Sequence, residues 1–271
     1  MPTHLLLKGS TLWALNGLAD PPESGLSLLK SANAVAIEVS EPTLRQEAVE
    51  EAIMASRLGL IIQAYPLQAT DFDETLQLAK THQAKAVNLQ VRLPHADQTV
   101  AAQFARELIL RAADENVAVY FETHRGCLTQ DLYRAVKLLE AVPEMRLTLD
   151  ASHYVLAEGQ CGVTDSLWPL LDPLLDRVEM IHGRISNGQQ IQMSVINPDG
   201  EIEQSFQHLW TEAMRRWRRR KPAGSTLIFT PELGPPPYAI VTPDGRELSN
   251  RMEQSEITWQ IAQAAWKQSA R

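Results

Sequence analysis

The sequence predicts a (β/α)₈ barrel that forms a single domain over residues 1–271. Short apolar runs alternate with longer amphipathic stretches along the chain, and most of these runs are apolar almost throughout, as strands buried on both faces should be. The length of 271 residues is close to the roughly 250 that such barrels need. An open doubly wound sheet is disfavoured because no glycine-rich phosphate loop follows the first apolar run.

The expected strands are eight short apolar runs. In chain order they cover residues 5–7, 34–39, 59–62, 86–91, 117–121, 147–149, 178–181 and 227–229. Eight strands that alternate with eight helices are the pattern of a closed parallel barrel.

The expected helices are the amphipathic stretches between these runs. They cover residues 24–32, 43–57, 71–82, 98–115, 129–141, 165–175, 205–220 and 250–268. Thr129, with Asp131 close behind, is the expected N-cap of one helix, and Thr164 with Asp165 that of the next. The polar segment 185–203 carries turn signals and is expected to form a lid or a small β-hairpin over the barrel mouth.

Composition and charge narrow the classes of function. The formal net charge is −8 and the isoelectric point about 5.4, so a nucleic-acid-binding surface is not expected. The one basic cluster, residues 215–221, ends a predicted helix, where cations complement the helix dipole. Cys127 and Cys161 form no CxxC pair, which favours a reduced cytoplasmic protein. We expect neither a signal peptide nor a membrane span.

Four consecutive predicted strands end in an ionisable residue. These residues are Glu122, Asp150, His182 and Glu232. Active sites of such barrels lie at the C-terminal strand ends, so the four side chains should meet. Three carboxylates at one place would repel one another, and a divalent cation removes that conflict. The ligand set suits one Mn²⁺, Mg²⁺, Co²⁺ or Zn²⁺ ion and does not choose among them.

With these residues in place, the chain resembles the xylose isomerase-like TIM barrel superfamily over nearly its whole length, and more narrowly its sugar isomerase and epimerase members. In that family a Glu, an Asp, a His and a Glu on successive strand ends bind one metal, and the four residues above match that order. His153 matches a histidine that often follows the aspartate by three residues. Arg184 matches a family arginine, although it follows His182 by only two residues. The string from Glu122 to Gly126 looks like that of an uncharacterised subgroup.

The resemblance implies a metal-dependent isomerase or epimerase of a ketose or keto acid that works through an enediolate. It assigns acid and base catalysis to Glu122 and Glu232. It gives His153 and Arg184 the task of binding substrate hydroxyls and developing negative charge. Three outcomes stay open. In an isomerase the proton returns to a neighbouring atom, and in an epimerase it returns to the opposite face. In a dehydratase a β-hydroxyl leaves instead.

Other polar residues near the expected barrel mouth are further candidates for substrate contacts. His124 and Arg125 are suited to a carboxylate or phosphate, and Gln192 belongs to the polar segment. Glu38, Gln63 and Asn88 are weaker candidates, and for all six a supporting or surface role is the competing interpretation. Trp13 follows the first strand and suits either a sugar face or the core.

Three alternatives remain beside the isomerase. The first is a metal-dependent lyase or dehydratase of a cyclic keto-polyol or a dehydroshikimate-like acid, which would use the same ligands. The second is a barrel that binds metal or sugar without turnover. The third, a relative of the apurinic endonucleases, is disfavoured because the additional histidines of that branch are absent. The expected partner is a small carbohydrate or keto acid, and homo-oligomerisation is left open because related barrels often form dimers or tetramers.

Overall fold

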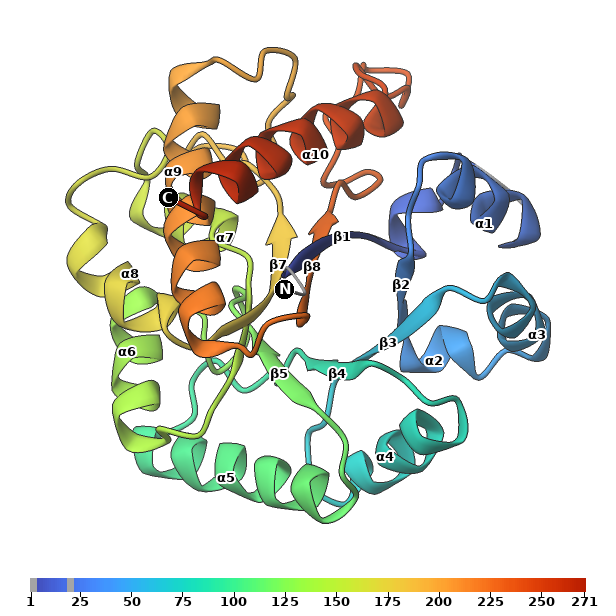
Figure 1. Cartoon of the computed structure of the whole chain (residues 1–271), viewed down its shortest axis with the longest axis vertical. Helices are drawn as coiled ribbons and strands as arrows, with labels where there is room; N and C mark the ends of the chain where they lie inside the picture. Colours follow the sequence, from blue (N-terminus) through green and yellow to red (C-terminus); the bar gives the residue numbers. More distant parts are fainter. Residues whose placement is uncertain (1–3, 19–21) are drawn as a thin grey trace.

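The structure is a computed structural model that describes residues 4–18 and 22–271. Eight parallel strands form one closed barrel in chain order, with β8 paired to β1. Figure 1 looks onto the ring of strands, with the helices arranged around its outside. The predicted (β/α)₈ barrel is therefore confirmed.

All eight predicted strands are present. They are β1 (Leu5–Thr11), β2 (Ala36–Ser40), β3 (Gly59–Ala64), β4 (Ala86–Leu89), β5 (Val119–Glu122), β6 (Leu147–Leu149), β7 (Val178–Gly183) and β8 (Thr226–Pro231). The largest difference is at β1, which continues to Thr11. Small and polar residues at its end carry no hydrophobic signal, but their backbone pairs with β2 from Gly9 onward.

The helices differ more from expectation. They are η1 (Trp13–Leu15), α1 (Pro22–Ser31), α2 (Glu41–Leu44), α3 (Glu47–Ser56), α4 (Asp71–Thr81), α5 (Gln98–Asp114), α6 (Leu132–Ala141), α7 (Ser152–Glu158), α8 (Trp168–Leu175), α9 (Glu201–Arg220) and α10 (Arg251–Gln268). The single helix expected over 43–57 is two helices, interrupted at Arg45 and Gln46. The short helix α7 was not predicted.

Both expected helix caps on threonine are wrong. Asp131 caps α6 by accepting a hydrogen bond from the backbone N–H of Arg134, at 2.9 Å. The Thr129 hydroxyl instead donates to the backbone carbonyl of Glu122. Helix α8 begins later than expected, after Leu167, and Thr164 lies outside it.

The segment 185–200, which the structure describes throughout, contains no strand, so the β-hairpin interpretation is wrong. Its backbone bonds to other parts of the fold: the N–H of Val195 donates to the side chain of Gln254 on α10, at 3.1 Å. Residues 201–203 belong to α9. No helix within the described residues combines the length and apolar character that a membrane span requires.

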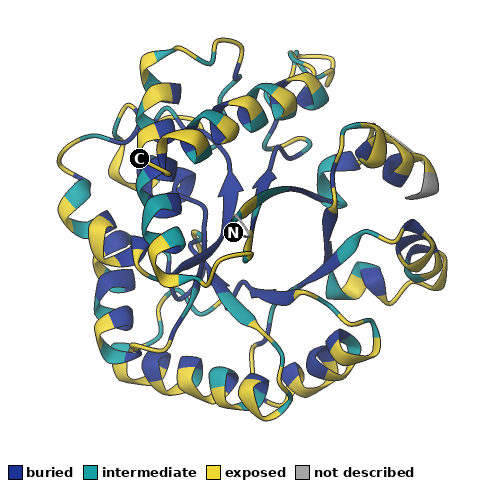
Figure 2. Ribbon diagram, in the orientation of Figure 1, coloured by how far each residue is buried: buried dark blue, intermediate teal, exposed yellow. Residues whose placement is uncertain are grey.

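Apolar side chains fill two places. The larger cluster lies between the strands and the helices, whose buried faces point toward the barrel in Figure 2. A smaller cluster consists of Ala36, Ile61 and Met180, with Tyr120 and Ile228 against it. Side chains alternate along a strand, so the residue two positions further faces the same side. From these five positions that step leads to Glu38, Gln63, His182, Glu122 and Thr230. A polar layer therefore lies above the apolar one.

Candidate metal centre and substrate cavity

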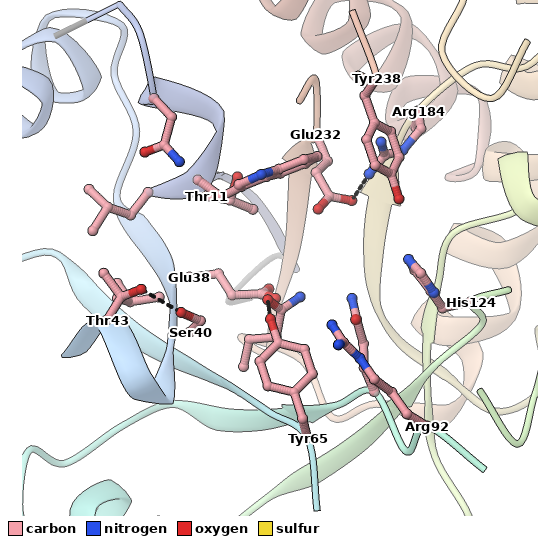
Figure 3. Close-up of a pocket in the computed structure, with 16 residues that line it drawn as sticks. Thr11, Glu38, Ser40, Thr43, Tyr65, Arg92, His124, Arg184, Glu232 and Tyr238 are labelled. Atoms are coloured by element: carbon pink, nitrogen blue, oxygen red, sulfur yellow. Dashed lines mark hydrogen bonds and ion pairs between the residues drawn. The ribbon is translucent and has the colours of Figure 1, made fainter. Parts of the chain in front are cut away.

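A cavity of about 330 Å³ opens where the strands end. Its polar lining includes Glu38, Tyr65, Arg92, His124, Arg184 and Glu232, which Figure 3 shows with Tyr238. Ligand pockets range from about 300 to 1,000 Å³, so this volume suits a small molecule.

His182 lies among three carboxylates at the floor of the cavity. Its Nε2 is 2.9 Å from Glu38 Oε2, and its Nδ1 is 3.0 Å from Glu232 Oε2 and 3.7 Å from Glu122 Oε1. The ring is fully buried. Burial lowers the pKa of His182, but the three negative neighbours outweigh it and hold the pKa well above its usual value.

Asn88 ties two of these carboxylates together. Its Nδ2 donates to Glu122 Oε2 at 2.7 Å and to Glu38 Oε1 at 3.0 Å. Gln90 donates to the same oxygen of Glu122 at 3.0 Å. One oxygen of Glu122 is thus satisfied, while Oε1 is buried without a hydrogen-bond partner. These contacts fix Glu122 with one oxygen left for another ligand.

Arg184 lies between the other two acidic residues of the predicted metal site. Its Nε is 3.2 Å from Asp150 Oδ2 and its Nη2 is 2.7 Å from Glu232 Oε2. The second oxygen of Asp150 accepts hydrogen bonds from the backbone N–H and hydroxyl of Ser152, at the start of α7. The unpredicted helix α7 therefore holds Asp150 in place.

The buried charges do not balance within the protein. Four carboxylates meet here, contributed by Glu38, Glu122, Asp150 and Glu232. Arg184 is their fixed positive partner, whereas His182 adds a second positive charge only while it is protonated, and it must be neutral to bind a metal. His153 is 3.5 Å from Asp150, but burial lowers its pKa well below the usual value and keeps it neutral. With all four carboxylates ionised and His182 neutral, three negative charges remain, and one divalent cation would neutralise two of them.

The donor atoms also fit a metal ion. Glu122 Oε1 and His182 Nδ1 are buried without a well-aligned hydrogen bond, whereas Glu232 Oε2 is buried and forms the ion pair with Arg184. His182 Nδ1 lies 3.7 Å from Glu122 Oε1 and 3.0 Å from Glu232 Oε2. Neighbouring ligands of an octahedral ion lie about 3.0 Å apart when each is about 2.1 Å from the ion. Asp150 forms a second convergent set with Glu122 and Glu232. The structure thus brings the four predicted ligands together and adds Glu38.

The predicted substrate contacts occupy different positions. His124 lines the cavity, and its ring lies over the buried His153, with ring centroids 3.9 Å apart. Arg125 is exposed, 5.0 Å from the ring centroid of Tyr238. Gln192 does not line the cavity, because both ends of its amide bond to the backbone of Gly234, at 2.7 and 3.1 Å. A direct contact between Gln192 and a substrate stays a prediction.

Aromatic rings form one wall of the cavity. Trp13 and Tyr238 meet edge to face with ring centroids 5.1 Å apart, and the guanidinium of Arg184 lies 4.5 Å from the Tyr238 ring. Gly234 packs so closely on the Trp13 indole that a Cβ added there would overlap it. Trp13 lies in the cavity wall, and stacking of its ring on a sugar stays a prediction.

The sequence indicates only weakly that Glu38 and Asn88 belong to the site. It does not indicate that Tyr65, Arg92 and Tyr238 line the cavity. A signal for the first pair exists, because each is a polar residue inside an otherwise apolar strand. No comparable local pattern marks the other three, which follow strand ends in connecting segments.

The sequence matches no known protein-family model and no curated protein. Among solved structures, it is similar to a xylose isomerase-like TIM barrel protein from Mycobacterium smegmatis in complex with magnesium. That protein has 14% identity and a TM-score of 0.60, with 98% of this chain and 97% of the other covered. A sugar phosphate isomerase/epimerase from Parabacteroides distasonis has 11% identity and a TM-score of 0.60, with 100% and 96% covered.

A probable 3-DHS dehydratase from Bacillus anthracis is similar to the same extent, with 13% identity, a TM-score of 0.58, and 94% and 97% of the two chains covered. Structural similarity at identities this low shows the fold alone. The chain has the fold of the xylose isomerase-like TIM barrels, as its strand-end residues predicted.

Proposed function

We propose that this chain is a divalent-metal-dependent isomerase or epimerase of a small ketose or keto acid. Glu122, Asp150, His182 and Glu232 would hold the ion, with Glu38 beside them. The observation that carries the proposal is the convergence of four carboxylates and a histidine, with Glu122 Oε1 and His182 Nδ1 lacking a hydrogen bond, at the floor of a small polar cavity. When bound, Mn²⁺, Mg²⁺, Co²⁺ or Zn²⁺ would polarise a carbonyl as a Lewis acid.

Glu232 is the first candidate for the base that accepts a proton. It lines the cavity, so a substrate can reach it. Burial raises its pKa, but the charges of Arg184 and His182 outweigh burial and lower the pKa below its ordinary value. Glu232 is therefore ionised, as a base must be, and its lowered pKa makes it a weaker base than an ordinary glutamate.

The proposed reaction also needs a general acid, so a second proton-transfer group must lie near the base. The resemblance assigns this role to Glu122, which lies under the cavity and is held by Asn88 and Gln90. Glu38 competes for the role because it lines the cavity. Arg184 and His124 also line it and would hold substrate oxygens, and His153 could join them where His124 moves aside.

The first test is metal binding by metal-free protein, measured by calorimetry and elemental analysis with each of the four ions. We expect one ion per chain for the wild type and a large loss of affinity for Glu122→Gln. Glu179→Gln is the matched control, because Glu179 is another buried glutamate but pairs with Arg220 and Lys221 away from the cavity. Absence of metal binding by the wild type would overturn the proposal.

The second test identifies the reaction. Metal-loaded protein is incubated with a panel of ketoses and keto acids in deuterated water. Deuterium incorporation without loss of water supports isomerisation or epimerisation, whereas a new conjugated-enone absorbance supports the dehydratase alternative. Metal binding without turnover of any member would favour a barrel that binds its ligand without reaction.

A further inference from the structure

One side of the cavity carries positive charge that the protein itself does not neutralise. Arg92, which follows β4, lines the cavity, and Arg125, which follows β5, lies against Tyr238 in the same lining. Neither arginine has an ion-pair partner among the residues that the structure describes.

The exposed side chain of Arg92 lies against an aromatic ring. Its guanidinium lies 4.4 Å from the ring centroid of Tyr65, whose hydroxyl donates a hydrogen bond to Gln63. Stacking on a ring leaves the N–H groups at the edge of the guanidinium free to bind a ligand. Figure 3 shows Arg92 beside Tyr65 at the cavity, with His124 on the neighbouring part of the wall.

Two parts of the cavity lining therefore suit different chemical groups. The acidic floor at Glu38 and Glu232 suits a metal ion and the uncharged oxygens of a carbonyl or hydroxyl. An anion there would be repelled, unless the metal bound it. The wall at Arg92 suits a carboxylate or phosphate, because a guanidinium binds such groups through two parallel hydrogen bonds.

We propose that the substrate carries a carboxylate or a phosphate in addition to its reacting oxygens, and that Arg92 binds this anion, with Arg125 adding attraction at the rim. This inference rests on the proposed function, since it assigns another group of the same ligand. It restricts the substrate to small anionic sugars such as sugar acids or sugar phosphates.

Three probes with one carbon skeleton test the inference: xylitol, xylonate and xylitol 5-phosphate. None has a ketose carbonyl, so binding to the Mn²⁺-loaded protein can be measured by calorimetry without turnover. A hydrogen-bonded ion pair should make one or both anions bind about 10- to 100-fold more tightly than xylitol. The better anion identifies the group as a carboxylate or a phosphate.

Substitutions connect this preference to Arg92. Arg92→Gln should remove most of it, and Arg92→Lys should retain part, because lysine keeps the charge but loses the paired hydrogen bonds. Arg219→Gln removes an equal charge from an exposed position on α9 and should leave the preference unchanged. Circular dichroism and the melting temperature establish that each variant is folded.

Equal affinity of the wild type for the three probes would overturn the inference, as would an anion preference that survives Arg92→Gln. Failure of the proposed function has a different signature, because it shows as absence of Mn²⁺ binding by the wild type. Repeating the probe titrations in the presence of EDTA separates the two, since the contact with Arg92 does not require the ion.

Discussion

Replacement of Arg184 by methionine should destabilise the metal-free protein and make its stability respond more strongly to divalent metal. The guanidinium lies 3.2 Å from Asp150 and 2.7 Å from Glu232, and all three side chains are buried. Removal of one partner from a buried ion pair costs about 3–5 kcal/mol, because the remaining charge is left uncompensated.

This free energy corresponds to a measurable change in melting temperature. An unfolding entropy of about 2.1 cal/mol/K per residue gives about 570 cal/mol/K for 271 residues. A loss of about 3–5 kcal/mol then lowers the melting temperature by about 5–9 °C. A metal present at about one hundred times its Kd restores about 2.7 kcal/mol, or about 5 °C.

The assay is thermal unfolding with EDTA and with Mn²⁺, for wild type and variant. We expect a larger Mn²⁺-induced shift for Arg184→Met, since the loss of the guanidinium frees two carboxylates. Arg251→Met is the control, because Arg251 is equally buried but pairs with Glu247 outside the acidic cluster. Either of two results would refute this prediction: the same melting temperature for Arg184→Met and the wild type in EDTA, or an equal Mn²⁺-induced rise in melting temperature for both proteins.

Three other substitutions test the surroundings of the site. Asn88→Ala removes the amide that ties two carboxylates together and should weaken metal binding about 10- to 100-fold in calorimetry, with an unchanged circular dichroism spectrum. Burial raises the pKa of Cys127 to about 12, whereas a cysteine in an unfolded chain has a pKa of about 8.5. Between pH values of about 8.5 and about 12 the unfolded state therefore binds fewer protons than the folded state. The free energy of unfolding should therefore fall as pH rises from about 8.5, and urea titrations of Cys127→Ala should show a smaller fall. Gly234→Ala should displace the Trp13 indole and cost about 1–3 kcal/mol, seen as a lower urea midpoint and altered tryptophan fluorescence.

The barrel and the floor of its cavity could be predicted because both follow from short-range patterns. Each buried strand is a short apolar run, and the chain direction fixes which end reaches the cavity. Glu122, Asp150, His182 and Glu232 stand at or just after such ends, and the structure brings them together.

The remaining features depend on contacts between residues far apart in the sequence. The contacts of Arg184 with Asp150 and Glu232 require β7, β6 and β8 to be correctly placed beside one another. Gln192 lies in a polar segment typical of a loop over the site, yet its amide is taken up by Gly234, 42 residues away. Thr129 is a residue type that often caps helices, but its hydroxyl donates a hydrogen bond to the backbone carbonyl at the end of β5.

The hydrogen bonds of Asn88 and His182 cross the inside of the barrel. Asn88 on β4 contacts Glu38 on β2, and Glu38 in turn contacts His182 on β7. In the ring these strands are not neighbours, so the polar layer joins segments that backbone pairing leaves separate. The amides of β2, β4 and β7 should therefore exchange with solvent as one cooperative unit rather than strand by strand. His182, one of the proposed metal ligands, would thus also take part in the opening of the barrel.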